Sequence, residues 1–173
     1  MVVACDANTI ATASVGALHL DTVFTYRIVQ GSLDRIALDL PGDLNVTQVV
    51  GGDILEWTID NKETGPRQLF VRLNRPHENR YVLRVVSERV LPAFPASFDL
   101  PLVQPNDVIR TSGFLLIGTD SAIKLLVNKA MGLTQVDQEA FPKVSMQNQV
   151  RRAPPRRSVF AYQYANMPYT MEF

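Results

Sequence analysis

The sequence has few of the residues that build metal sites and disulfides. Its 173 residues include one cysteine, Cys5, and two histidines, His19 and His77. A single thiol forms no internal disulfide and supports no cysteine-based zinc site. The two histidines fall on separate predicted elements, and no ligand spacing surrounds either one. We therefore interpret both as surface residues and predict no metal site and no other cofactor.

The chain also lacks a surplus of charge and a long apolar run. Its 17 basic and 17 acidic side chains cancel, so there is no overall positive field to hold nucleic-acid phosphates. Its longest apolar runs, such as residues 114–117, are much too short for a transmembrane helix. We predict neither a nucleic-acid partner nor a transmembrane segment.

Motifs of catalysis are missing too. The serines do not stand in a Gly-x-Ser-x-Gly nucleophile elbow, and there is no phosphate loop or dinucleotide fingerprint. Glu56 and Asp60 share one parity of a predicted strand, but a solvated strand face explains charges there without a catalytic role. The sequence therefore predicts a protein that is not an enzyme.

Alternation of apolar and polar residues is the dominant pattern. It runs through residues 18–28, 36–40, 55–59, 69–73 and 81–85, and it is typical of strands with one buried face. With Gly, Pro, Asn and Asp turns between the runs, it predicts an all-β, mainly antiparallel β-sandwich of about ten strands. Residues 122–130 are expected to form a strand, with one short helix as the alternative.

Parity also predicts which side chains are buried. The core is expected to contain Leu38, Leu40, Leu55, Trp57, Ile59, Leu69, Val71, Leu83, Val85, Phe114 and Leu116. Arg72 and Arg84 fall on the opposite parity and are expected on the solvent face. Because a short polar connection separates the runs at 69–73 and 81–85, we predict that they pair as an antiparallel hairpin.

The domain organisation follows from changes in composition. Residues 1–142 are predicted to form the sandwich domain, in which the proline-rich residues 92–105 cross the sandwich as an extended segment. Residues 143–158 form a basic, proline-containing loop or linker, and residues 159–173 form terminal strands. These strands either complete the sheet beside the strand at 18–28 or begin the next module of a longer protein. We favour completion, because an unpaired apolar strand promotes aggregation.

The end of the chain is also the best candidate for an interaction surface. It combines basic and aromatic side chains: Arg151, Arg152, Arg156, Arg157, Phe160, Tyr162 and Tyr164. Basic groups near aromatics can bind single-stranded nucleic acid, but here the aromatics share one strand face, which is typical of a core. We expect a protein partner, a neighbouring module of the same protein, or a second copy added by strand pairing.

Several segments together carry a resemblance. They are "YRIVQGSLDRIALDLP", "ILEWTID", "LFVRLNRPHENRYVLRVVSE", "LPLVQPNDVIRTSGFLLIG" and "PYTMEF". Their order resembles that of uncharacterised tandem β-sandwich modules of large bacterial envelope proteins. The resemblance implies an extracytoplasmic structural or interaction role and supplies no catalytic residue. A carbohydrate-binding or carbohydrate-active sandwich and a viral coat jelly roll are the alternatives.

Overall fold

A computed structural model describes residues 1–61, 65–93, 95–119, 123–142 and 157–173, with the side chains of 157 and 158 left out. It confirms the all-β class: the described residues form β-strands and a single 3-10 turn, η1 (Gln138–Ala140). The strands are β1 (Val2–Ser14), β2 (Ala17–Gln30), β3 (Leu33–Leu40), β4 (Asn45–Gly51), β5 (Ile54–Asp60), β6 (Arg67–His77), β7 (Arg80–Val90), β8 (Gln104–Pro105), β9 (Arg110–Thr119), β10 (Lys129–Met131), β11 (Thr134–Val136), β12 (Arg157–Tyr164) and β13 (Thr170–Glu172).

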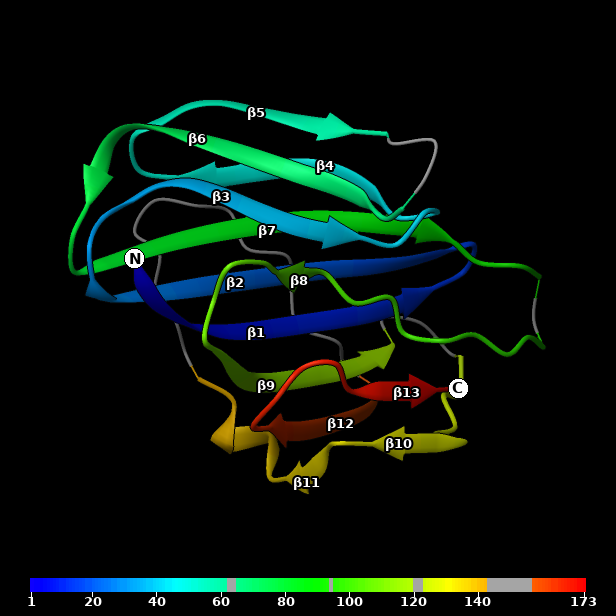
Figure 1. Cartoon of the computed structure of the whole chain (residues 1–173). Helices are drawn as coiled ribbons and strands as arrows, with labels where there is room; N and C mark the ends of the chain where they lie inside the picture. The colour runs from blue at the N-terminus through cyan, green and yellow to red at the C-terminus, as the bar shows by residue number, and fades with distance from the viewer. Residues whose placement is uncertain (62–64, 94, 120–122, 143–156) are drawn as a thin grey trace.

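A seven-stranded sheet forms the main layer of the molecule (Figure 1). Its order is β11-β12-β9-β1-β2-β7-β4. The long strands β1 and β2 form an antiparallel hairpin, which turns at Gly16 with a φ of 82°. Glycine adopts this left-handed conformation without the steric cost that a Cβ brings. On its other edge β1 pairs in parallel with β9, so β9 joins the sheet by a long connection through the rest of the chain.

Two smaller layers cover this sheet. The four-stranded sheet β5-β6-β3-β8 packs across one half, and the pair β10-β13 lies near the other half, by β9 and β12 (Figure 1). The proline-rich segment crosses between them and buries Leu91, Phe98, Leu100 and Val103, as the sequence predicts. It is tied to β13 by reciprocal backbone hydrogen bonds between Phe98 and Phe173 of 2.9 and 3.0 Å.

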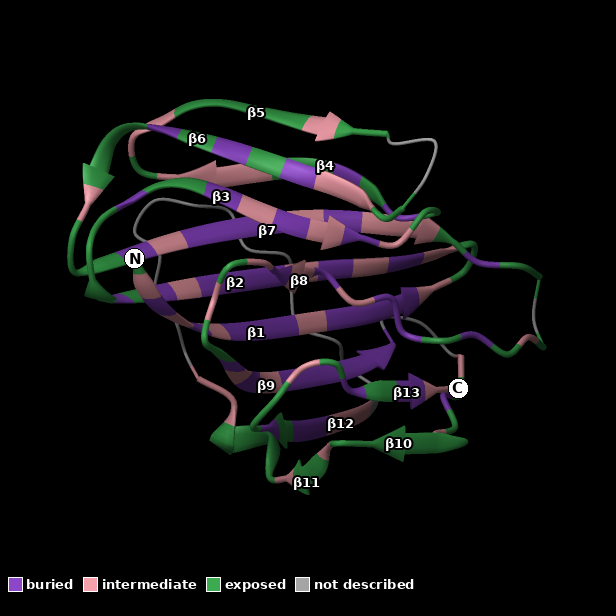
Figure 2. Cartoon of the chain, viewed as in Figure 1, coloured by how far each residue is buried: buried purple, intermediate pink, exposed green. Residues whose placement is uncertain are grey.

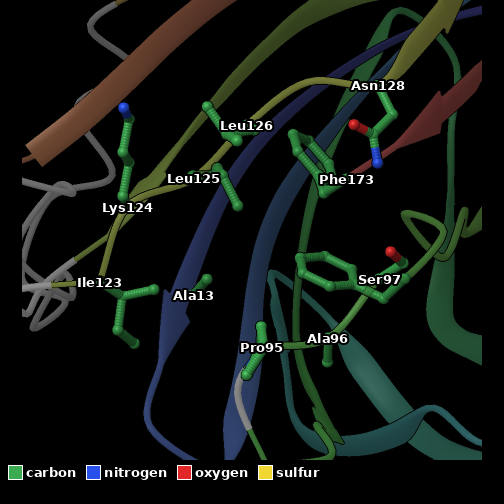
Figure 3. Close-up of a pocket in the computed structure, with 11 residues that line it drawn as sticks. Ala13, Pro95, Ala96, Ser97, Ile123, Lys124, Leu125, Leu126, Asn128 and Phe173 are labelled. Carbon is green, nitrogen blue, oxygen red and sulfur yellow. The ribbon is translucent and has the colours of Figure 1, made fainter.

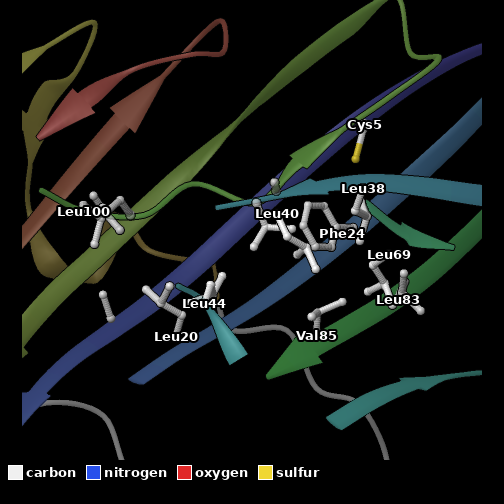
Figure 4. Packing of buried hydrophobic residues seen from close by; sticks show 14 of the residues in the cluster. Cys5, Leu20, Phe24, Leu38, Leu40, Leu44, Leu69, Leu83, Val85 and Leu100 are labelled. Atoms are coloured by element: carbon white, nitrogen blue, oxygen red, sulfur yellow. The ribbon is translucent and has the colours of Figure 1, made fainter. Parts of the chain in front are cut away.

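The core lies between the layers, and parity predicts much of it. Buried residues alternate along the long strands in Figure 2, and Phe24, Leu38, Leu69 and Leu83 meet between the two large layers in Figure 4. The predicted core residues that are confirmed as buried are Leu38, Leu40, Leu69, Val71, Leu83, Val85 and Leu116.

The prediction for β5 is wrong in part. Leu55 is 49% exposed and Trp57 38% exposed, while Ile59 is half-buried. Trp57 stands opposite the buried Val71 and so faces inward, but β5 is an edge strand and little of the other sheet lies over it. Leu55 is the extra residue of a bulge between Ile54 and Glu56. On β9 the predicted face is the wrong one, because Leu115 and Ile117 belong to the core cluster, whereas Phe114 is only half-buried and Leu116 is buried outside that cluster.

The predicted hairpin of β6 and β7 is wrong as well. β6 pairs with β3 and β5 in the small sheet, whereas β7 pairs with β2 and β4 in the large one. The short turn at Glu78 and Asn79 therefore crosses from one layer to the other. Both strands point their apolar side chains at the same core from opposite sides, and alternation alone does not distinguish this from a hairpin.

Arg84 is buried instead of exposed. It lies on the outer face of the large sheet and donates two hydrogen bonds to Asp21 on β2, of 2.9 and 2.7 Å. The hydrogen bonds to Asp21 raise the pKa of Arg84. Arg72, by contrast, is exposed as predicted and pairs with Glu56 at 3.2 Å.

The last strands complete the sheets within the chain, but not beside β2. β12 pairs antiparallel with β9 on one side and with β11 on the other, and β13 pairs with β10. The region predicted as one strand or a helix at 122–130 is neither: residues 123–128 have no regular structure, Lys129 begins β10, and residue 122 lies outside the described residues.

The exposure of β5 leads to a stability prediction. Replacing Leu83, which is fully enclosed, with alanine should lower the free energy of unfolding by about 2–5 kcal/mol because it leaves a cavity. Replacing Trp57 with alanine should cost less, because part of the indole already faces solvent. Urea unfolding of Leu83→Ala and Trp57→Ala measures both, and a larger loss for Trp57→Ala would contradict the placement of β5 at an open edge.

Candidate functional site

The seven residues of the predicted interaction surface differ in how far the structure describes and buries them. Arg151, Arg152 and Arg156 lie outside the described residues, and Arg157 is described only as the first backbone position of β12. Phe160 packs half-buried against the core, while Tyr162 and Tyr164 are buried. Packing inside the chain therefore accounts for the aromatic residues, and a binding role for the seven residues stays a prediction.

A break in the central parallel pair is the most unusual feature of the large sheet. β1 and β9 keep one pairing offset along their whole length, but the paired positions stop at Asp6 and Ser112 and resume at Thr9 and Leu115. In the gap, side chains replace ladder hydrogen bonds. Asn8 Oδ1 accepts from the backbone N–H of Phe114 at 3.0 Å.

Tyr164 supplies a second side-chain hydrogen bond at this break. Its hydroxyl donates to the backbone carbonyl of Ala7 at 2.5 Å, and burial raises its pKa far above the usual tyrosine range. The path of the ring requires Gly113. A Cβ at that position would lie 1.9 Å from Ala7 O and 2.9 Å from the Tyr164 hydroxyl. Only glycine leaves room for this contact.

A polar cavity of about 260 Å³ opens beside the break. Its polar side chains come from three neighbouring strands and include Asp6, Asn8, Arg110, Ser112 and Gln163. Ser112 Oγ donates to Asp6 Oδ1 at 2.8 Å, and Arg27 lies 3.5 Å from the other carboxylate oxygen. The site has charges of both signs and several amide groups.

A second, larger cleft is apolar (Figure 3). It has a volume of about 550 Å³ and lies between the proline-rich segment and residues 123–128. Leu125 and the ring of Phe173 line it, and Phe173 packs on Phe98 with ring centroids 5.2 Å apart. Leu126 on its rim is 61% exposed. Such a surface can take up an apolar side chain of another domain, chain or ligand.

An ionic cluster holds the turn between β4 and β5. Asp53 has a φ of 54°, and its Oδ2 accepts from Arg75 Nε at 2.8 Å and lies 3.1 Å from His77 Nε2. The hydrogen bond from Arg75 lowers the pKa of Asp53, and His77 adds to the effect. The Tyr81 hydroxyl donates to Gly52 O at 2.8 Å. His77 therefore has a structural role at this end of the sandwich.

The other residues weighed for chemistry do not converge. His19 lies 3.6 Å from Glu88 on the neighbouring strand. Trp57 and Phe70 are both partly exposed, but they stand on opposite faces of the small sheet and so form no shared platform beside Glu56. The described ranges contain no group of three or more His, Cys, Asp or Glu side chains placed to hold a metal ion. Within the same ranges no helix has the length and apolar character that crossing a membrane requires.

Comparison with known proteins shows similarity in structure and not in sequence. No protein-family model matches the chain, and no curated protein matches it significantly. Among solved structures, leukotriene A4 hydrolase from Saccharomyces cerevisiae matches with a TM-score of 0.58 at 14% identity, over 99% of this chain and 28% of that one. An M1 zinc metallopeptidase mutant from Deinococcus radiodurans matches with a TM-score of 0.52 at 14% identity, over 98% of this chain and 41% of that one.

These matches show the fold alone, because the identities are so low. The chain spans 28–41% of the length of these two proteins, so it matches only a part of each. The resemblance to tandem envelope modules stays a prediction from the sequence.

The break and its cavity were missed from the sequence. Asn8 has the parity of an ordinary polar strand residue, and nothing in the alternation marks it. The available signal was Gly113 inside a strand, since such a glycine often marks a bulge or a close approach of another group.

Two buried tyrosines provide a matched test of the break. Tyr164→Phe leaves the Ala7 carbonyl without its side-chain donor and should lower the free energy of unfolding by about 1–3 kcal/mol. The buried Tyr26 hydroxyl has no hydrogen-bond partner among the described residues. Although the Cys5 thiol lies near it, Tyr26→Phe should be close to neutral. Equal losses for the two variants in urea unfolding would contradict the role of Tyr164.

The Asp53 cluster predicts a pH dependence. Because the pKa of Asp53 is lowered in the folded protein from 3.8, its stabilising effect is complete above that value and is lost as the pH falls through the folded-state pKa. Asp53→Asn keeps a residue that tolerates the left-handed backbone but removes the charge. The native protein should therefore exceed Asp53→Asn in urea midpoint at pH 7, and the gap should close toward pH 3. A gap that does not change with pH would contradict the ionic role.

Proposed function

We propose that this chain is a non-catalytic β-sandwich domain that packs against another domain of the same longer protein. One observation carries the proposal: almost the whole chain matches a part of two larger proteins, an M1 zinc metallopeptidase and a leukotriene A4 hydrolase, of which it covers 41% and 28%. In those proteins most of the chain lies outside the matched part. By analogy, the role of this domain is to support and orient a neighbour.

The apolar cleft supplies the surface for this role. Leu126 presents its side chain to solvent beside the buried Leu125 and Phe173. A large apolar side chain that leaves solvent on docking contributes roughly 1.5–3 kcal/mol. We assign the neighbouring domain to this cleft in preference to an added strand at the β5 edge, because β5 carries a bulge and charged side chains, which are devices that limit strand pairing.

The docking role can be tested in the longer protein with an exposed-site variant. Leu126→Asp should leave the stability of the isolated domain within about 0.5 kcal/mol, because the side chain is mostly exposed. In the longer protein the same change should separate one cooperative unfolding transition into two. Val29→Asp is the matched control, since Val29 is 71% exposed and does not line the cleft. Unchanged unfolding of the longer protein with Leu126→Asp would contradict the assignment.

The non-catalytic role has its own test. The purified chain, with and without added zinc, should not hydrolyse a panel of aminoacyl anilides and polysaccharides. Hydrolysis that persists through purification and that a single substitution abolishes would overturn the proposal. The outcome is independent of the docking experiment, because docking and catalysis are measured on different molecules.

A further inference from the structure

The polar cavity beside the break in β1 and β9 has the character of a ligand site, separate from the apolar cleft. Asn8, Phe114 and Gln163 occupy one row across β1, β9 and β12, on the parity opposite to the core residues Ala7, Leu115 and Tyr162. The cavity therefore opens on the outer face of the seven-stranded sheet.

The cavity contains one hydrogen-bond donor that no described residue engages. Asn8 is only 9% exposed, and its Oδ1 is engaged by the Phe114 N–H. Its amide nitrogen has no partner among the described residues, yet it is not one of the enclosed, unpaired atoms. The –NH2 group of this cavity-lining residue is therefore a donor with no acceptor among the described residues. A donor that the fold already holds in place has little ordering entropy to lose on binding an acceptor.

The rim of the cavity also holds a cation that can bind an anion. The Asp6 carboxylate is compensated by the Ser112 hydroxyl at 2.8 Å and by Arg27 at 3.5 Å. Arg110, on the same rim, is exposed and forms no ion pair with any described residue. A guanidinium group binds a carboxylate through two parallel hydrogen bonds, which makes a carboxylate the best-matched anion.

We propose that this cavity binds a small carboxylate ligand with an adjacent amide. Arg110 and the Asn8 amide hold the carboxylate, and the side-chain amide of Gln163 pairs with the ligand amide. A volume of about 260 Å³ is below the range of about 300–1,000 Å³ for drug-sized ligands, so the bound part is about one residue long. This chemistry occurs at the C-terminus of a peptide and in a free N-acylamino acid. The proposal does not depend on the role of the domain in a longer protein.

Titration of the isotope-labelled chain tests the proposal by nuclear magnetic resonance. N-acetylglycine should shift the backbone amide signals of Gly113 and Phe114 in a saturable way, whereas N-acetylglycinamide, which lacks the carboxylate, should not. If an acylated tripeptide binds as tightly as N-acetylglycine, the site is assigned to the C-terminus of peptides. If the tripeptide binds much more weakly, the site is assigned to free small molecules. Both results support the shared chemistry.

Three variants make the test decisive. Arg110→Gln should weaken N-acetylglycine binding at least about tenfold, the loss expected for one charge-assisted hydrogen bond. Arg35→Gln, which changes an exposed arginine on β3 of the other sheet, should have no effect. Asp6→Asn should tighten binding, because it removes the competing carboxylate. Equal shifts with N-acetylglycinamide, or unchanged affinity in Arg110→Gln, would overturn the proposal, and acetate binding as tightly as N-acetylglycine would overturn the role of Gln163.

Discussion

The fold depends on the pairing of β9 with another strand on each of its two edges. One edge of β9 pairs with β1, near the start of the chain, and the other with β12, near its end. The Tyr164 hydroxyl then reaches past β9 to the Ala7 carbonyl and joins two residues separated by 157 positions. Neither neighbour is local in sequence, so the sheet is complete only when both ends of the chain have come together. Because loop-closure entropy opposes such distant contacts, we expect this protein to fold slowly.

The pairing of β9 on both edges also accounts for the two candidate sites, the polar cavity and the apolar cleft. The parallel pairing of β1 and β9 is interrupted where Tyr164 crosses Gly113, and the polar cavity lies on the other side of that interruption. The apolar cleft arises where the proline-rich segment and β13 cover the far half of the sheet. That segment contains prolines that donate no backbone hydrogen bond, so its pairing with β13 is short. It leaves an apolar space beside Phe98 and Phe173.

Sequence alternation predicts which face of a strand is apolar. It predicts neither the sheet to which the strand belongs nor whether another layer covers that face. It identifies Leu38, Leu69 and Leu83 as core residues because those strands are overlaid on their inner face. Trp57 has the same parity, yet it is partly exposed because β5 is at an edge. Whether a strand is at an edge depends on long-range pairing, which periodicity does not record.

Polar side chains that are buried on the outer face of a sheet are still harder to predict. Arg84 has the parity of a solvated residue, and its burial depends on Asp21, which is 63 positions away. Asn8 accepts a hydrogen bond from the backbone of Phe114 at a position where the pairing of β1 and β9 is interrupted. Such roles depend on tertiary neighbours, so a single sequence without its fold gives them no distinctive pattern.

The most direct test of this account is removal of residues 159–173, followed by thermal unfolding and light scattering. Deletion removes most of β12 and all of β13, which bares the hydrogen-bonding edge of β9 and uncovers Leu115 and Ile117. We expect the truncated protein to lose its cooperative transition and to aggregate, because a long apolar edge becomes available for pairing. Addition of a peptide with the deleted sequence should partly restore solubility. A truncated protein with the same melting temperature and solubility as the intact chain would contradict the central role of β9 pairing on both edges.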